Sequence, residues 1–117
     1  MSQVTIWHNP KCSKSRQTLQ LLRDQGVEPE VYEYLKANPG EAEIKELLGQ
    51  LGISARQLLR TKEAEYKELD LKNPAKSEED LIQAMAQHPR LIERPIYLRE
   101  GRAALGRPPE QVLELLP

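Results

Sequence analysis

The stretch VTIWHNPKCSKSRQTLQLLRD, residues 4–24, decides the fold of this chain. Its beginning, Val4 to His8, is a short β-rich run that Asn9 and Pro10 end, a pattern that predicts a buried strand followed by a turn. From about Ser13 to Asp24, leucines recur on one face and polar residues on the other, which predicts an amphipathic helix. The only cysteine, Cys12, therefore stands where a strand has ended and a helix begins.

The next segment predicts a second strand beside the first. Gly26 is expected to end the helix, and EPEVYEYL, residues 28–35, then alternates apolar and acidic residues. A strand, a helix and a second strand in this order predict a βαβ unit.

The middle of the chain has a different character. Between Glu41 and Gln87 no convincing strand pattern occurs, and leucines at helix spacing predict several helices. Ser54 and Ser77 are expected to be N-caps, the second followed by acidic residues that favour the helix dipole. We expect a helical insertion over about residues 41–88.

The end of the chain returns to strands. Two short apolar runs, Ile96 to Leu98 and Ala103 to Leu105, predict a tight hairpin, and Pro108 with Pro109 is expected to start a last helix. This order is that of a thioredoxin-like α/β domain, with a four-stranded mixed sheet flanked by helices and a helical insertion between strands 2 and 3. We expect residues 1–117 to form a single domain.

Composition excludes several classes of protein. The 117 residues are 38% hydrophobic and 30% charged, as in ordinary globular proteins. The formal net charge is −1 with both signs interleaved, so no nucleic-acid partner is expected. No secretory signal or membrane span is visible, and one cysteine suits a reducing compartment, so we expect a cytoplasmic protein.

The position of Cys12 predicts a reactive thiol. Unpaired N–H groups and the positive end of a helix dipole face such a position, and helix N-termini with basic neighbours lower thiol pKa values. Lys11, Lys14, Arg16 and His8 could supply the charge. A buried structural cysteine is the alternative, against which the polar residues on both sides argue. Because no second cysteine follows in CSKS, a reductant must bring its own sulfur.

Three arginines lie at breaks in the pattern: Arg60, Arg94 and Arg107. Arginine presents a planar fork that suits tetrahedral oxyanions. Arg94 precedes Pro95, and in a thioredoxin-like domain the proline that begins the third strand is cis and faces the reactive cysteine. We therefore expect a cis-Pro95 that delivers Arg94 next to Cys12. A metal site is not expected, because structural zinc needs four ligands and only two histidines accompany the cysteine.

Four ordered blocks, which span nearly the whole chain, resemble the glutaredoxin-coupled arsenate reductase family. They are VTIWHNPKCSKSR, GISARQLLRTKEAEY, HPRLIERPI and GRPPEQVLELLP. The resemblance implies an enzyme whose cysteine thiolate attacks arsenate, after which glutathione, as co-substrate rather than bound cofactor, and glutaredoxin supply electrons and arsenite is released. It implies Cys12 as nucleophile, His8 lowering the thiol pKa and Ser15 hydrogen-bonding the sulfur. Three arginines would hold the oxyanion: Arg60, Arg94 and Arg107.

Two other functions stay open. A general glutathione-dependent thiol oxidoreductase needs the same single cysteine, and the sequence SKS after Cys12 differs from the GTS of members best known for arsenate reduction. A regulator of the Spx type, which binds RNA polymerase, shares the architecture, but many such proteins carry a second cysteine where Ser15 stands here.

Overall fold

The computed structural model describes residues 4–106 and 109–115. The chain divides into two compact units. The first contains the described residues up to Ala37 and from Arg94 onward, and the second is Asn38–Glu93. The second unit includes the whole segment expected as a helical insertion and extends past it at both ends. That the chain acts as a single domain stays a prediction.

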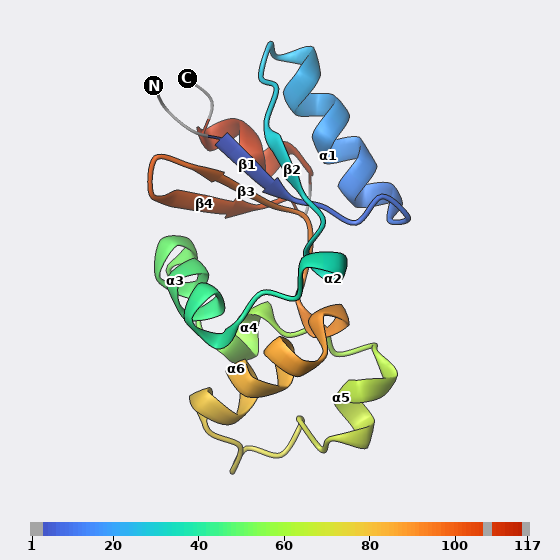
Figure 1. Cartoon of the computed structure of the whole chain (residues 1–117), viewed down its shortest axis with the longest axis vertical. Coiled ribbons are helices and arrows are strands. Elements are labelled where there is room, and N and C mark those ends of the chain that lie inside the picture. Colours follow the sequence, from blue (N-terminus) through green and yellow to red (C-terminus); the bar gives the residue numbers. More distant parts are fainter. Residues whose placement is uncertain (1–3, 107–108, 116–117) are drawn as a thin grey trace. The chain divides into compact units, whose positions relative to one another are not determined.

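The first unit is built on a four-stranded mixed sheet (Figure 1). Its strands are β1 (Val4–Trp7), β2 (Glu30–Tyr32), β3 (Ile96–Arg99) and β4 (Arg102–Leu105), in the order β2-β1-β3-β4. β1 runs parallel to β2 and antiparallel to β3, and β4 is antiparallel to β3. The sheet predicted from the order of elements is confirmed.

Two helices cover one face of this sheet, α1 (Ser13–Asp24) and the 3-10 helix η2 (Pro109–Leu115). Ile6 of β1 is paired with Tyr97 of β3, and both side chains have no exposed surface. They pack with the apolar faces of the two helices, and the cluster consists of Ile6, Leu19, Leu22, Val27, Tyr97, Val112 and Leu115. Burial of this apolar cluster holds α1 against the sheet. It thereby also fixes Cys12, the residue that precedes α1.

The hairpin between β3 and β4 has the short turn that the sequence predicts. Glu100 and Gly101 both have positive φ, 52° and 78°. Two consecutive positive φ values match a two-residue turn of the primed type, whose twist suits antiparallel strands. The last helix begins at Pro109 and is a 3-10 helix; the other expected start, Pro108, lies outside the described residues.

The second strand is shorter than its pattern suggests. β2 covers only Glu30–Tyr32, and Tyr34–Ala37 forms the short helix α2 instead of continuing the strand. Tyr34 is 1% exposed, and its ring stacks on Trp7 with the centroids 6.0 Å apart. Alternation of apolar and polar residues could not reveal this aromatic contact, which links residues from β1 and α2.

The second unit is helical, as expected. Its elements are α3 (Glu41–Leu51), α4 (Ala55–Leu58), α5 (Ala64–Glu68), α6 (Glu78–Gln87) and the 3-10 turn η1 (Pro89–Leu91). Ser54 and Ser77 are N-caps, and each forms a capping box with the residue three positions later. A single β-bridge between Leu59 and Ile92 joins the segments after α4 and η1.

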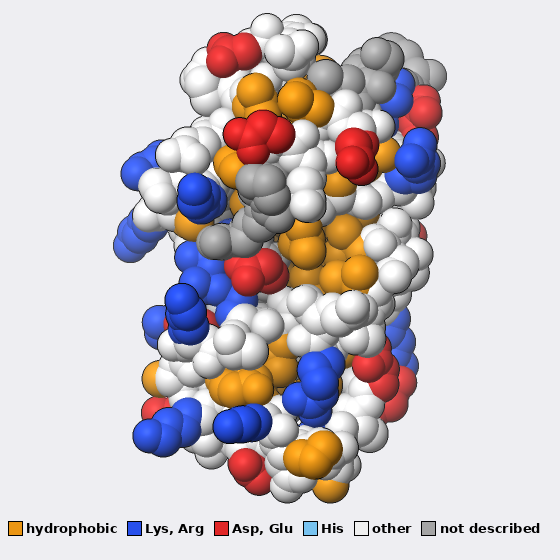
Figure 2. All heavy atoms as spheres, turned by 180° about the vertical axis from the view of Figure 1, so that it is seen from behind, with side chains coloured by type: hydrophobic (Ala, Val, Ile, Leu, Met, Phe, Trp, Pro, Cys, Tyr) orange, Lys and Arg blue, Asp and Glu red, His pale blue; other side chains and the backbone are white. Residues whose placement is uncertain are grey.

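Among the described helices, none combines the length and the apolar character that crossing a membrane requires. On the face drawn in Figure 2, lysine and arginine side chains lie among acidic and apolar ones. This mixture of charges follows the interleaving seen in the sequence.

Candidate active site

Cys12 is the N-cap residue of α1. Its backbone is extended, with φ −96° and ψ 124°, and its carbonyl accepts the first helical hydrogen bond, from Arg16 N–H, at 3.0 Å. Its own N–H donates to Asn9 O at 3.0 Å, which closes the turn after β1. The first amides of a helix have no partner within the helix, so the cap position is where an anion is stabilised by N–H groups and by the helix dipole.

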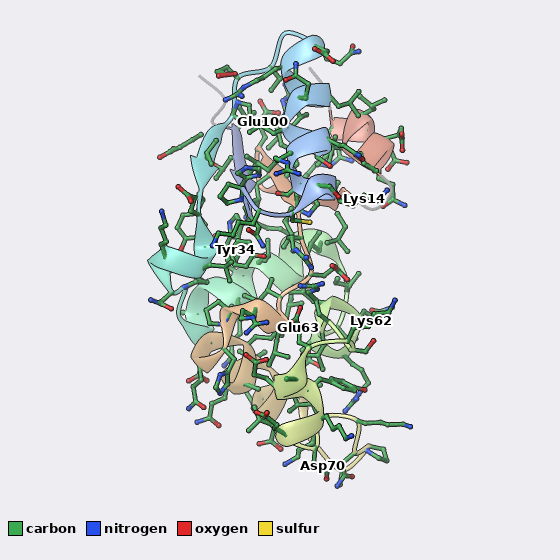
Figure 3. The ribbon with its side chains drawn as sticks, turned by 90° about the vertical axis from the view of Figure 1, so that its right-hand side faces the viewer. Lys14, Tyr34, Lys62, Glu63, Asp70 and Glu100 are labelled. Carbon is green, nitrogen blue, oxygen red and sulfur yellow. The ribbon has the colours of Figure 1, made fainter. Side chains whose placement is uncertain are left out.

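The first turn of α1 differs in charge from those of the other long helices. α3 begins with Glu41 and Glu43, and α6 begins with three acidic residues, whereas α1 has none in its first turn. Lys14 lies there instead and is exposed (Figure 3). Acidic first-turn residues neutralise the positive end of a helix, and their lack in α1 leaves that end free to favour an anionic sulfur or ligand.

The burial of Cys12 differs from what its neighbours indicate. Lys11, Ser13 and Lys14 are exposed, yet Cys12 is 8% exposed and Ser15 is fully buried. Polar neighbours were therefore a wrong guide to the surroundings of this side chain. The reason is geometric, because successive residues around a helix start point in different directions, and only positions 12 and 15 turn inward.

His8 and Ser15 form one hydrogen-bonded group under the turn. His8 Nδ1 lies 2.6 Å from Ser15 Oγ, and this oxygen also accepts a bond from Asn9 N–H at 3.0 Å. His8 is 6% exposed and Ser15 has no exposed surface. These bonds tie the end of β1 to the first turn of α1 and so fix the loop that carries Cys12. A bond from Ser15 to the sulfur stays a prediction.

The environment of His8 disfavours the positively charged imidazole that would lower the pKa of a nearby thiol. Burial lowers the pKa of His8 from its usual 6.5, and the nearby Glu33 carboxylate opposes this only in part. At neutral pH the neutral imidazole is therefore favoured. The role expected from the resemblance, a positive imidazole beside the thiol, finds no support in this shift, whereas a positioning role through Ser15 Oγ agrees with the geometry.

Pro95 and Arg94 belong to the same unit as Cys12. The Arg94–Pro95 peptide bond is cis, the isomer expected from the sequence. Gly106 fits tightly here: a methyl group on its Cα would come within 2.8 Å of both Pro95 Cγ and Thr18 Oγ1. The start of β3 thus lies against α1 two turns after its cap. Arg94 is half-buried, and its Nε and Nη1 atoms are inaccessible to solvent.

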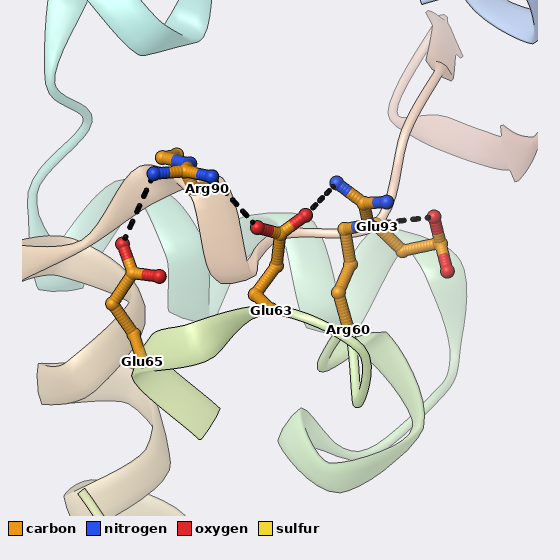
Figure 4. Close-up of polar contacts among 5 residues, drawn as sticks. All are labelled: Arg60, Glu63, Glu65, Arg90 and Glu93. Atoms are coloured by element: carbon orange, nitrogen blue, oxygen red, sulfur yellow. Dashed lines mark hydrogen bonds and ion pairs between the residues drawn. The ribbon is translucent and has the colours of Figure 1, made fainter. Parts of the chain in front are cut away.

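Arg60 lies in the second unit, within an ion-pair network (Figure 4). Its Nη1 is 2.6 Å from Glu63 Oε1, and its Nε is 3.6 Å from Glu93 Oε1. Glu63 also pairs with Arg90, through Oε2 and Nη2 at 3.1 Å. Three of these partners were not singled out in the sequence: Glu63, Arg90 and Glu93. Only the three-residue spacing of Arg60 and Glu63 was a visible signal.

The remaining predicted residue, Arg107, lies outside the described residues. Within the part of the chain that the structure describes, no three residues among His, Cys, Asp and Glu are grouped as metal ligands would be. A surface pocket of about 220 Å³ lies beside α6 and is lined in part by Leu69, Leu71 and Asp80; none of the predicted site residues lines it.

Comparison with known proteins gives a consistent result. The chain is 56% identical over 115 residues to YfgD of Escherichia coli K12, an uncharacterized protein, with 97% of each chain covered. It is 46% identical to an arsenate reductase of Neisseria meningitidis, over 99% of this chain and 100% of the other. The solved structure of an arsenate reductase from Vibrio cholerae matches with a TM-score of 0.95 and 54% identity, over 97% of this chain and 98% of the other. The model of the ArsC family matches residues 7–115, and the chain therefore belongs to this family.

Proposed function

We propose that this protein is an oxidoreductase that reduces arsenate to arsenite, with glutathione and glutaredoxin as the source of electrons. The observation that carries the proposal is the placement of the chain's only cysteine at the cap of a 12-residue helix without acidic residues in its first turn. Family membership and relatives named arsenate reductase support the choice of arsenate.

In the proposed reaction, the Cys12 thiolate attacks the arsenic atom, an S–As bond forms, and one arsenate oxygen leaves as water after protonation. One glutathione thiol then displaces a second arsenic-bound oxygen as water and forms its own S–As bond. A glutaredoxin thiolate attacks the sulfur of this glutathione, the electron pair of the cleaved S–As bond reduces arsenic from +5 to +3, and a second glutathione frees glutaredoxin as glutathione disulfide forms. Water finally cleaves the bond between Cys12 and arsenic, which releases arsenite and restores the thiol. With one cysteine per chain, the reductant has to come from another molecule.

The proposed roles of the other residues follow from what each group can do. His8 and Ser15 hold the loop of Cys12, and Ser15 offers its hydroxyl near the reacting sulfur. Arg60, Arg94 and Arg107 supply guanidinium groups for the oxyanion, whose charge such groups stabilise more strongly than ammonium does. Phosphate is expected to bind without reacting, because thiols do not reduce its phosphorus.

The test is arsenite release by the purified protein, with glutathione and glutaredoxin each omitted in turn. Release that requires both supports the proposal. A parallel reaction with thioredoxin and its reductase identifies a different donor if it alone sustains release. No arsenite under any of these conditions would refute arsenate reduction.

The second candidate is a general glutathione-dependent thiol oxidoreductase. It rests on the same single cysteine and on the residues SKS that follow it. Reduction of a glutathione-mixed disulfide on a model peptide, without arsenite release from arsenate, would favour this function over the first.

A further inference from the structure

The guanidinium of Arg60 lies between two carboxylates. Glu63 Oε1 is 2.6 Å from its Nη1 and Glu93 Oε1 is 3.6 Å from its Nε (Figure 4). The side chains of Arg60 and Glu63 are 20% and 14% exposed, so water screens the pair only in part. Any anion that binds Arg60 therefore meets a nearby negative charge that is not easily displaced.

A guanidinium has two edges, and an oxyanion can form two hydrogen bonds with either of them. In Arg60 each edge has a glutamate next to it. One edge is formed by Nε and Nη2, the other by Nη1 and Nη2. Glu93 lies next to the first edge and Glu63 next to the second. An oxyanion on either edge thus has one of its oxygens close to a carboxylate oxygen.

The network brings several carboxylates close to the guanidinium of Arg60. Within the described part of the chain, its ion pairs join Arg60, Glu63, Glu65, Arg90 and Glu93. An oxyanion without a proton would be repelled by these carboxylates. No hydrogen bond could form between the oxyanion and a carboxylate, because neither group carries a hydrogen to donate. An ionised carboxylate only accepts hydrogen bonds.

Oxyanions differ in whether they carry a proton. Near neutral pH arsenate and phosphate keep at least one O–H group, whereas sulfate and selenate keep none. An O–H group can donate to a carboxylate oxygen, so the same contact attracts the first class and repels the second. A largely buried carboxylate forms a hydrogen bond with one class of anion and faces a like charge in the other. Such a contact discriminates strongly between the two classes of ligand.

We propose that Glu63 makes the Arg60 site selective for protonated oxyanions, accepting a hydrogen bond from their O–H group and excluding sulfate and selenate. The inference rests on the proposed function, in that Arg60 is taken as an oxyanion ligand. It adds a specificity-determining residue and defines the class of anion that the site accepts.

Glu63 fits this role better than its acidic neighbours. Its contact with Arg60 is 1.0 Å shorter than that of Glu93, 2.6 against 3.6 Å. Its second oxygen is bonded to Arg90 at 3.1 Å, which holds the carboxylate in place when an anion shares Arg60. Glu65 pairs only with Arg90 among the network residues, at 3.8 Å, and has no ion pair with Arg60. It is therefore the matched control.

The experiment measures binding of inorganic phosphate and of sulfate to the full chain by titration calorimetry, near neutral pH and at constant ionic strength, and repeats it as inhibition of arsenite release. The parent is expected to prefer phosphate by about tenfold or more. Glu63→Gln is expected to bind sulfate about tenfold more tightly, because an amide can donate to it, and to lose most of the preference. Glu65→Gln removes the same charge two positions away and is expected to keep the parental ratio.

Each outcome decides the matter. An unchanged ratio in Glu63→Gln, an equal loss in Glu65→Gln, or a parent that binds sulfate as well as phosphate overturns the inference. The parental measurement stands even if Glu63→Gln does not fold, which far-UV circular dichroism reports. A further result is a parent that prefers phosphate, with Glu63→Gln abolishing the preference, while no arsenite is released under any condition. That result refutes the proposed reaction but supports the selectivity of the site. If arsenite is released without any preference between the two anions, the selectivity alone falls.

Discussion

At the scale of single residues, the fold places Cys12 at a helix cap, on a loop that is held by hydrogen bonds of His8 and Ser15. Ser15 Oγ lies 2.6 Å from His8 Nδ1 and accepts a hydrogen bond from Asn9 N–H at 3.0 Å, and Asn9 O accepts one from Cys12 N–H at 3.0 Å. Preorganised donors and a held loop reduce the reorganisation that a charged reaction needs. The chemistry of the site is thus expected to depend strongly on Cys12 and moderately on the residues that hold it.

Cys12→Ser is expected to abolish arsenite release, a loss of at least about a thousandfold, because a hydroxyl at neutral pH is a far weaker nucleophile than a thiolate. The stability should change little, since serine is close to cysteine in size. Steady-state release and urea unfolding measure the two effects. Ser13→Ala, at the exposed neighbouring position, serves as the control. Retained activity in Cys12→Ser would remove the nucleophile from the mechanism.

Ser15→Ala is expected to destabilise the protein by about 1–3 kcal/mol, because it leaves His8 Nδ1 and Asn9 N–H without their common partner in a buried place. Urea denaturation of the variant against the parent measures the difference. A variant as stable as the parent would show that water replaces the hydroxyl without loss.

His8 predicts a loss of stability in mild acid. Its folded-state pKa is lowered by burial from 6.5, so the unfolded state takes up the proton first. Stability is therefore full above about pH 6.5 and falls as the pH decreases through the folded-state pKa. Unfolding free energies at about pH 7.5 and about pH 5.5 test this, and Asp80, whose pKa is lowered from 3.8, titrates below that window. His8→Gln should flatten the dependence; an equally steep fall in the variant would assign it to other groups.

At the scale of elements, the contact between the start of β3 and α1 positions the site. Gly106 leaves room for Pro95 and Thr18 to approach, and Gly106 N–H donates to Pro95 O at 2.9 Å. The strand that follows Arg94 is thereby held beside the helix that follows Cys12. Packing of this kind tolerates little added volume.

Gly106→Ala is expected to destabilise the protein by about 1–3 kcal/mol, since the methyl group would lie 2.8 Å from two atoms that belong to a ring and to a helix side chain. Gly49→Ala is the matched control, because it adds the same methyl group in α3 with no atom within 4 Å. In a helix interior this change should stabilise by about 0.5–1 kcal/mol. Thermal unfolding of both variants measures the contrast, and effects of the same sign would contradict it.

At the scale of the whole molecule, the decisive feature is that the chain holds one thiol. A disulfide of Cys12 must join it to a sulfur of another molecule. In the proposed reaction, turnover therefore depends on the concentration of an external thiol, which supplies the electrons.

Oxidised glutathione is expected to add one glutathione per chain, at Cys12, and glutaredoxin to remove it. Intact-protein mass spectrometry measures the adduct, and Cys12→Ser should show none. An adduct-free parent after prolonged oxidation would argue that the 8% exposure of Cys12 keeps glutathione out, and that an accessible state is needed before reaction.

Much of the fold could be predicted because local signals agree with the final structure. Residues 4–24 combine a β-rich run, an Asn-Pro break and a helical period, and the structure has β1, a turn and α1 there. Ser54 and Ser77 cap helices because a hydroxyl satisfies N–H groups two or three residues away, a contact that needs no distant partner. Tyr34 was misplaced in a strand because its ring packs on Trp7, a contact between segments that local alternation does not record.

By itself the sequence determined which chemical groups are present and which lie close along the chain: one thiol at a helix start, a basic first turn and the order of strands and helices. Only the tertiary structure decided that Cys12 is buried, that His8 favours the neutral form, and that Arg60 faces Glu93. The physical reason is that burial, desolvation and ion pairing depend on groups brought together from distant positions, such as Arg90 and Glu63, 27 residues apart. Patterns of neighbouring residues in the sequence do not predict contacts between residues that are far apart along the chain.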